Sequence, residues 1–227
     1  MIDWQQIDTV LLDMDGTLLD LHFDNYFWLQ HLPKLYAERE QISEAEATEH
    51  LHSRFHAGRG TLAWYSLDHW SEQLDMDIPA LKRELQHMVA IRPYALDFLK
   101  RLHASDRDVV LVTNAHRKTL DIKMEEVDIT PWFDRVVVSH DLDAPKEDLS
   151  FWHRLQLLHP FDPGRTLFID DTETVLDSAR EYGIAHLLTL LQPDSQHQKR
   201  LDTRFPGIHH FDEIMPEPAE TDTGVHT

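Results

Sequence analysis

The strongest constraint on the fold is a series of short apolar runs that alternate with segments of helical periodicity. The runs are rich in Val, Ile and Leu and cover residues 9–12, 108–112, 136–138, 166–169 and 185–191. Continuous apolar runs are typical of parallel strands that are buried on both faces, and parallel strands need a crossover such as a helix between them. The chain is therefore predicted to be an α/β protein in which helices cover both faces of a parallel sheet.

The first two runs are separated by a long stretch without any strand-like pattern. Residues 21–91 show helical periodicity instead. We expect residues 1–20 and 92–215 to form the core, and residues 21–91 to form an all-helical cap inserted after the first strand. Residues 216–227 are acidic and nearly free of large apolar side chains, so they are expected to be disordered.

Local signals place helices within this inserted stretch. A capping box begins a helix at Ser43. Thr61 is predicted to cap a single helix that continues to Leu74. Pro79 marks the first turn of a further helix that is predicted to reach Met88.

Composition and charge exclude several classes of function. The 227 residues include 41 Asp and Glu against 21 Lys and Arg, and the formal charge of −20 argues against non-specific nucleic-acid binding. The chain has no cysteine, which excludes disulfides and thiol chemistry. It shows neither a signal peptide nor an apolar run of membrane-spanning length. We therefore expect a cytoplasmic protein without nucleic-acid or membrane partners, for which a small anionic substrate stays possible.

Polar side chains that suit metal and phosphate chemistry follow three of the predicted strands. They are Asp13 and Asp15, Thr113 and Asn114, and Asp170 and Asp171. Because the carboxyl ends of parallel strands open onto one crevice, these groups are expected to share a small volume. Several carboxylates so close together require a cation, and an all-oxygen ligand set favours Mg²⁺. Lys146, in a loop after the third predicted strand, would offset the remaining negative charge.

Taken in order, these residues resemble the four motifs of the haloacid dehalogenase superfamily. The matching segments are Asp13-Met14-Asp15-Gly16-Thr17, Thr113, Lys146 and Asp170-Asp171. The resemblance extends over roughly residues 7–191 and includes a helical cap between the first two motifs. It implies a Rossmann-like core and a Mg²⁺-dependent phosphatase.

The resemblance also implies catalytic and substrate-binding roles. Asp13 would be the nucleophile that forms an aspartyl-phosphate, and Asp15 would protonate the leaving oxygen and later activate water. Thr113 and Asn114 would bind the phosphoryl group, and Lys146 would steady both the nucleophile and the developing charge.

The metal ligands implied by the resemblance come from the first and last motifs. They are Asp13, Asp15 through its backbone carbonyl, and Asp171, with Asp170 binding either directly or through water. The superfamily also contains dehalogenases, which do not need the second aspartate as a proton donor. Asp15 therefore favours phosphoryl chemistry.

A subgroup resemblance points to the substrate. The Pro145-Lys146-Glu147-Asp148 form of the third motif is similar to bacterial purine nucleotidases that hydrolyse GMP and IMP, as are segments of the cap at 60–65 and 67–70. This implies a purine nucleoside monophosphate as substrate. We expect the protein to be a monomer or dimer. The cap aromatics Trp64, Tyr65 and Trp70 favour core packing by their helical spacing, although such side chains can also stack on a purine.

Several alternatives stay open. The same chemistry could act on a sugar phosphate or phosphoglycolate, a phosphomutase would return the phosphoryl group to its product, and a binding module could keep the fold without catalysis. Each motif also has a structural interpretation. Asp170 and Asp171 could only stabilise a helix N-terminus, Thr113 and Asn114 could only cap a helix, and Lys146 could be a solvated surface residue.

Overall fold

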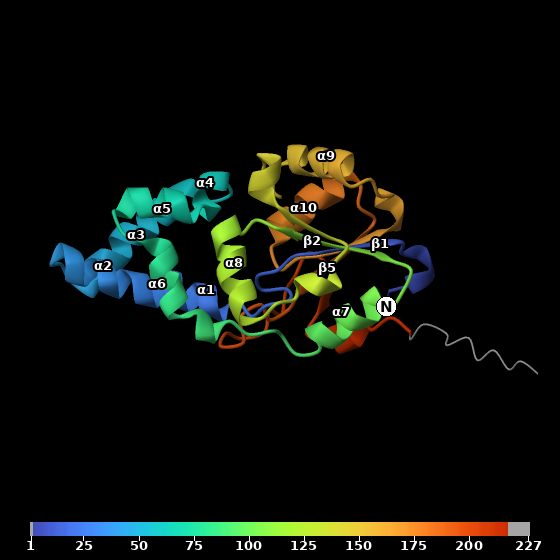
Figure 1. Ribbon diagram of the computed structural model, residues 1–227, viewed down its shortest axis with the longest axis horizontal. Helices are drawn as coiled ribbons and strands as arrows, with labels where there is room; N and C mark the ends of the chain where they lie inside the picture. Colours follow the sequence, from blue (N-terminus) through green and yellow to red (C-terminus); the bar gives the residue numbers. More distant parts are fainter. Residues whose placement is uncertain (1, 218–227) are drawn as a thin grey trace, which may run out of the picture.

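The structure is a computed structural model that describes residues 2–217 (Figure 1). A parallel sheet with helices on both faces confirms the predicted α/β class. The strands are β1 (Thr9–Leu12), β2 (Asp108–Thr113), β3 (Arg135–Val138), β4 (Thr166–Ile169), β5 (His186–Leu190) and β6 (Gly207–Ile208). Their order is β3-β2-β1-β4-β5-β6, so β1 lies inside the sheet and pairs with β2 and β4.

Alternate residues of the strands pack into separate hydrophobic cores on the two faces of the sheet. Val10 and Leu12 pack with α7 (Ala95–His103), whereas Leu11 packs with α9 (Leu149–Leu158) and α10 (Glu173–Tyr182). In Figure 1, α7 lies on one side of the sheet, and α9 and α10 lie on the other. Because successive strand side chains point to opposite faces, both faces must be apolar, which explains the continuous apolar runs.

The residues from 22 to 88, which we call the helical lobe, contain no strand. The elements are α1 (His22–Tyr26), the π-helix η2 (Phe27–His31), α2 (Leu32–Glu40), α3 (Glu44–Gly58), α4 (Leu62–Tyr65), α5 (Leu67–Leu74), α6 (Ile78–Glu84) and the 3₁₀ turn η3 (Gln86–Met88). The predicted capping box at Ser43 is present. The lobe has its own core around Phe27, Leu51 and Trp70. Helix α8 (Arg117–Glu126), which follows β2, packs against α6 and lies between the helical lobe and the sheet in Figure 1.

Two helix boundaries in this lobe differ from the predictions. The helix predicted from Thr61 to Leu74 is broken at Ser66, whose backbone is extended with ψ of 118°. The Ser66 hydroxyl accepts a hydrogen bond from His69 N at 3.2 Å and so caps a new helix, an alternative to continued helix that serine side chains offer. The helix predicted to reach Met88 ends at Glu84, because the chain tightens into a 3₁₀ turn.

The sheet also contains one strand that the sequence pattern does not predict. β6 pairs with β5 but has only two residues, too few to show a strand period.

The C-terminal segment is described only in part. The predicted disordered tail lies outside the described residues from position 218 onward, while Pro216 O accepts a hydrogen bond from Arg101 at 3.0 Å. Between residues 2 and 217, no helix is long and apolar enough to cross a membrane.

Candidate active site

The candidate residues meet because their strands lie side by side. Leu12 at the end of β1 is in register with Ile169 at the end of β4, and β1 pairs with β2 on its other side. The Asp13 amide continues this ladder by donating to Ile169 O at 3.0 Å. The strand ends therefore bring Asp13 next to Asp170 and place Thr113 at the same edge of the sheet.

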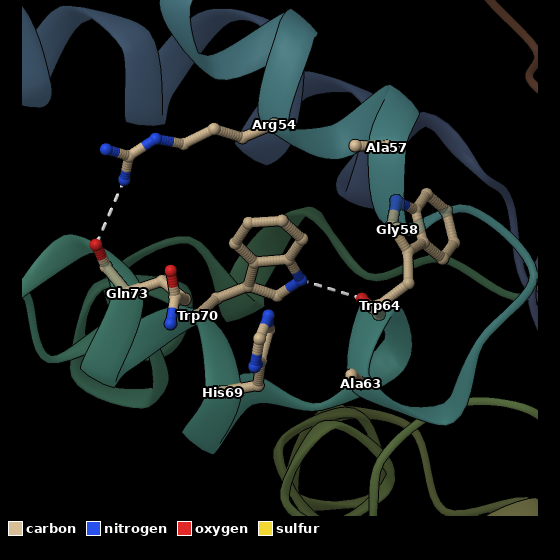
Figure 2. Close-up of a pocket in the computed structure, with 8 residues that line it drawn as sticks. All are labelled: Arg54, Ala57, Gly58, Ala63, Trp64, His69, Trp70 and Gln73. Atoms are coloured by element: carbon tan, nitrogen blue, oxygen red, sulfur yellow. Dashed lines mark hydrogen bonds between the residues drawn. The ribbon is translucent and has the colours of Figure 1, made fainter.

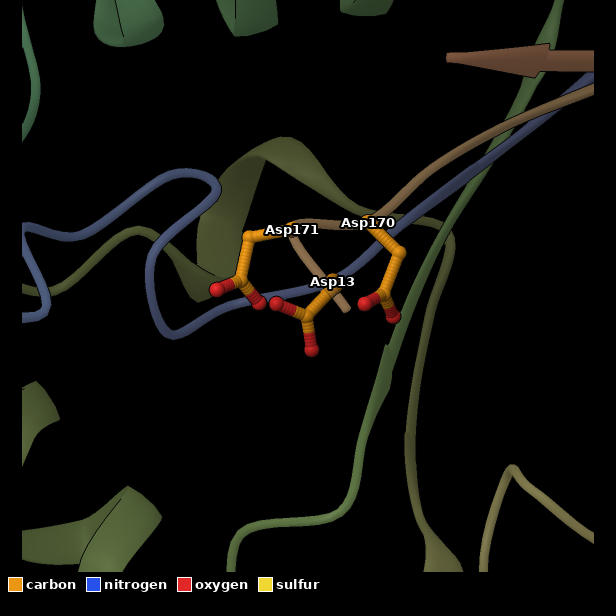
Figure 3. Close-up of side chains that lie close together, drawn as sticks. All are labelled: Asp13, Asp170 and Asp171. Atoms are coloured by element: carbon orange, nitrogen blue, oxygen red, sulfur yellow. The ribbon is translucent and has the colours of Figure 1, made fainter. Parts of the chain in front are cut away.

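Asp13, Asp170 and Asp171 form a buried group of carboxylates. One oxygen from each lies within 4.8 Å of the others, and no residue of the group is more than 7% exposed. Figure 3 shows Asp13 between the other two, with all three carboxylates on the same side. Asp13 Oδ2 is buried and has no hydrogen-bond partner among residues 2–217. Because an unpaired buried carboxylate oxygen is unfavourable, this oxygen-only group fits a hard divalent cation.

Lys146 supplies positive charge to this group. Its Nζ donates to Asp13 Oδ1 at 2.6 Å, to Asp170 Oδ2 at 2.7 Å and to Val112 O at 3.1 Å. Burial opposes the charged form, but the neighbouring carboxylates of Asp13 and Asp170 raise the pKa of Lys146. The lysine is therefore a fixed buried cation and not a solvated surface residue.

Gly16 allows the loop after β1 to approach Asp171. Its φ is +80°, in the left-handed region that favours glycine. A Cβ atom at this position would lie 2.8 Å from both Cγ and Oδ2 of Asp171. Any larger residue would therefore displace the carboxylate or the loop.

Asp15 lies apart from the three grouped carboxylates. Its side chain is 22% exposed, and its Oδ1 accepts a hydrogen bond from Lys123 of α8. Burial raises the pKa of Asp15 to about 6, against the opposing effect of Lys123, and the charges of Asp24 and Asp13 add to the rise. A carboxyl group with a pKa near 6 can give and take a proton close to neutral pH.

Thr113 is buried at the end of β2, and its Oγ1 accepts a hydrogen bond from Ala115 N at 3.0 Å. It does not cap the following helix, because His116 occupies the N-cap of α8 and makes no side-chain cap bond. The Thr113 hydroxyl therefore shapes the turn that leads from the strand end into α8.

The helical lobe reaches the site through Tyr65 of α4. The Tyr65 hydroxyl donates to Glu147 Oε1 at 2.6 Å, and Asn114 Nδ2 donates to Glu147 Oε2 at 2.9 Å. Asn114 Oδ1 in turn accepts from Lys146 N at 2.9 Å. The sequence offered purine stacking as a possible role for Tyr65 and placed Glu147 in the third motif, but it did not predict their contact, since only the packing of the lobe against the sheet brings them together. The one available signal was the position of Glu147 directly after Lys146.

A separate cavity of about 390 Å³ lies within the helical lobe between α3, α4 and α5 (Figure 2). None of the grouped carboxylates lines it; Arg54, Trp64 and Trp70 are among the residues that do. Trp70 is 4% exposed, donates to Trp64 O at 2.7 Å and packs edge-on against Phe55. The predicted packing role is therefore confirmed for Trp70, while Trp64 is half-buried at the cavity wall.

We predict that stabilisation of this protein by Mg²⁺ depends on pH through Asp171. Burial, followed by the charge of Asp13, raises the pKa of Asp171 to about 7. Since this folded-state pKa lies above the ordinary value of 3.8, the group destabilises the metal-free fold progressively as pH rises towards 7. A cation needs the deprotonated carboxylate, so its affinity should be about tenfold weaker at pH 6 than at pH 8.

Thermal melting with increasing MgCl₂ at the two pH values measures this effect. The rise in Tm should begin at lower Mg²⁺ concentration at pH 8 than at pH 6. Asp171→Asn should reduce the rise in Tm with MgCl₂ at both pH values, because it replaces the titrating carboxylate that the cation needs. Equal Mg²⁺ dependence at both pH values in the unmodified protein would contradict the prediction.

Comparison with known proteins gives independent information about the chain. The haloacid dehalogenase-like hydrolase family model matches residues 7–183. The GMP/IMP nucleotidase YrfG of Escherichia coli (strain K12) is 40% identical over 215 residues, which cover 95% of this chain and 97% of that protein. The Shigella flexneri protein of the same name matches with the same identity and coverage.

Solved structures share the fold. A HAD phosphatase from Thermococcus onnurineus has a TM-score of 0.74 at 19% identity and covers 91% of this chain and 95% of its own. The HAD-hydrolase YfnB from Bacillus subtilis, in a structure bound to magnesium, has a TM-score of 0.61 at 20% identity and covers 91% and 96%. Because the family model spans β1 to α10 and the nucleotidase aligns over nearly the whole chain, this protein belongs to the haloacid dehalogenase-like hydrolase family.

Proposed function

We propose that this protein is a Mg²⁺-dependent phosphomonoesterase that hydrolyses the purine 5′-mononucleotides GMP and IMP to nucleoside and phosphate. One observation carries the phosphatase proposal: Lys146 holds one oxygen of the buried Asp13 carboxylate, and the other oxygen has no partner within residues 2–217 and lies beside two further carboxylates. In phosphoryl transfer an anionic nucleophile must approach an anionic phosphate. A cation bound beside the Asp13 carboxylate would reduce their repulsion. The 40% identity to a protein named GMP/IMP nucleotidase supports the choice of substrate.

The proposed reaction has two steps. An oxygen of Asp13 attacks phosphorus, the bond to the nucleoside 5′-oxygen breaks, and Asp15 gives its proton to that oxygen. Water then attacks the aspartyl-phosphate and passes a proton to Asp15, and the bond to Asp13 breaks to release phosphate. Thr113, Asn114 and Lys146 would hold the phosphoryl oxygens and offset their charge.

Asp13, Asp171 and the backbone carbonyl of Asp15 are the proposed metal ligands. Both oxygens of Asp170 already accept hydrogen bonds, from Lys146 at 2.7 Å and from Thr172 N at 2.8 Å, which favours contact through water for this residue. Bound Mg²⁺ would neutralise charge on the nucleophile and on the phosphate.

Residues 21–91 are the proposed cap, and residues 1–20 and 92–215 the proposed catalytic core. The contact of Tyr65 with Glu147 supports this division, as does a hydrogen bond between His140 Nε2 and Leu62 O at 3.0 Å. Such contacts suit a cap that closes over a substrate and excludes water. The oligomeric state, monomer or dimer, and the cytoplasmic location stay predictions.

A panel of phosphate esters tests the proposed function. Purified protein with MgCl₂ is incubated with GMP, IMP, AMP, glucose 6-phosphate or phosphoglycolate, and released phosphate is measured. We expect kcat/KM for GMP and IMP to exceed that for the sugar phosphate and phosphoglycolate by at least about tenfold, since a purine offers more groups for discrimination. Addition of EDTA should stop the reaction, and excess MgCl₂ should restore it.

The possible outcomes separate the alternatives. Release of phosphate from none of the esters would contradict a phosphatase of any kind. Preference for a sugar phosphate would keep the chemistry and reject the nucleotide substrate. Transfer of the phosphoryl group between isomers without stoichiometric release of phosphate would indicate a mutase.

A further inference from the structure

A second cluster of charged side chains, with two buried lysines and two partly buried aspartates, lies between the helical lobe and the sheet. Its members are Asp15, Asp24, Lys82 and Lys123. Lys123 Nζ contacts Asp15 Oδ1 and lies 2.5 Å from Asp24 Oδ2, while Lys82 Nζ lies 2.7 Å from Asp24 Oδ1. The cluster therefore runs without interruption from the proposed proton donor into the helical lobe.

Three helices supply the other members of this cluster. Lys123 is on α8, Asp24 is on α1, and Lys82 is on α6. The centroid of the Phe23 ring lies 4.8 Å from Lys82 Nζ and 5.4 Å from Lys123 Nζ, so the ring stabilises both ammonium groups through cation–π interactions. Both lysine side chains are at most 2% exposed, so these contacts replace water around their charges.

Stability alone does not explain two buried lysines at this position. Two ammonium groups face two carboxylates, but the free-energy cost of removing these ions from water offsets much of their attraction. Apolar residues of similar volume often stabilise a buried position as well or better. The ion pairs instead form a chain that ends at Asp15, the carboxylate that the proposed mechanism uses for proton transfer. Lys123 is the link, because it is the residue that touches both Asp15 and Asp24.

We propose that Lys123 is a positioning residue that holds the Asp15 carboxylate for proton transfer, and that Asp24 fixes Lys123 in turn. This inference rests on the proposed function, which assigns Asp15 its role. Among residues 2–217, Lys123 makes the only side-chain hydrogen bond to Asp15, and it leaves Oδ2 for the reaction. Without this bond the partly exposed carboxylate would populate other rotamers, and a general acid must stay within hydrogen-bond reach of the leaving oxygen.

Two esters that depend differently on the proton donor provide the test. The nucleoside alkoxide of GMP is strongly basic and needs a proton as it leaves, whereas p-nitrophenolate leaves readily without one. Lys123→Met removes the charge and keeps an unbranched side chain of similar length. The first turnover is measured by rapid quench for GMP and by absorbance for p-nitrophenyl phosphate, both at saturating MgCl₂.

We expect Lys123→Met to slow the first turnover of GMP by about 100-fold, and that of p-nitrophenyl phosphate by less than about fivefold. Hydrolysis of the aspartyl-phosphate also uses Asp15, so p-nitrophenyl phosphate should show a burst of p-nitrophenolate followed by slow turnover. Lys123→Arg keeps the charge and should recover about tenfold of the loss on GMP. A purely structural role for Lys123 would not separate the two esters.

Lys118→Met is the matched control. Lys118 is also on α8 and also pairs with an aspartate of the helical lobe, Asp68, but it is about half exposed and makes no contact with Asp15. We expect both first turnovers in this variant to stay within about twofold of the unmodified protein. If Lys123→Met does not fold, Asp24→Asn replaces it, with an expected loss of about tenfold on GMP and little on p-nitrophenyl phosphate.

Two results would overturn the proposal: equal losses on the two esters in the folded variant, or an unchanged first turnover of GMP. If the unmodified protein hydrolyses neither ester, the proposed function itself is contradicted, so this outcome is distinct from a failure of the positioning role.

Discussion

Asp13→Asn is expected to abolish phosphate release from GMP while leaving the fold intact. The amide cannot form an aspartyl-phosphate, so kcat should fall by at least about 10⁴-fold. The change is nearly isosteric, and it removes one negative charge from beside Asp170 and Asp171. The Tm of the metal-free protein should therefore be unchanged or higher, and the increase in Tm with MgCl₂ should become smaller.

Asp134→Asn provides a control for this change. Asp134 precedes β3 at the opposite end of the strands from the site, where its Oδ2 accepts a hydrogen bond from Val109 N at 2.8 Å. Its replacement should leave kcat within about twofold. Activity of Asp13→Asn near that of the unmodified protein would exclude Asp13 as the nucleophile.

Lys146→Met is expected to reduce both stability and activity. The ammonium group holds Asp13 and Asp170 in a buried site, so its loss leaves their charges without a partner and should cost about 3–5 kcal/mol of unfolding free energy. Loss of the positive charge beside the reacting phosphoryl group should also lower kcat by about 10²- to 10³-fold. Denaturant unfolding and phosphate release measure the two effects.

Added MgCl₂ should restore part of the stability of Lys146→Met but little of its activity, because a cation can offset the carboxylate charges without replacing the contact to the nucleophile. Lys146→Arg should recover stability more than kcat, since the planar guanidinium does not match the geometry of an ammonium group. If metal-free Lys146→Met unfolds at the same denaturant concentration as the unmodified protein, Lys146 does not offset the charges of Asp13 and Asp170 as proposed.

Much of the sheet was predictable because local pattern and tertiary environment agree there. The bounds of β1 and β4 coincide with the predicted runs, 9–12 and 166–169. All residues of these strands are buried, so every position has an apolar or small side chain that the sequence pattern reveals. The errors fall where local hydrogen bonds compete with periodicity, as at Ser66, or where a strand is too short to have a pattern, as in β6.

The meeting of the site residues was also predictable in outline. Asp13, Lys146 and the adjacent pair Asp170 and Asp171 come from three separate segments, but parallel strands align their carboxyl ends, and the structure places these four side chains together. The sequence did not predict which carboxylate oxygens are hydrogen-bonded and which one is left for the reaction. Hydrogen bonds already engage both oxygens of Asp170, whereas Asp13 Oδ2 has no partner in the part of the chain that the structure describes. This distinction depends on positions of atoms and not on residue type.

The sequence by itself determined the α/β class and the strands β1 to β5, because burial on both faces requires continuous apolar runs. The expected chemistry of Asp13 and Asp15 came from the resemblance of their motif to the family. Only the tertiary structure decided what holds Asp15. Lys123 lies on a helix that contains another, exposed lysine, Lys118, and no local pattern marks one as buried beside the site. Its burial and its partners arise where α8 packs against α6 and where Lys123 pairs with Asp24 of α1. Contacts between distant segments leave no signature in either segment alone.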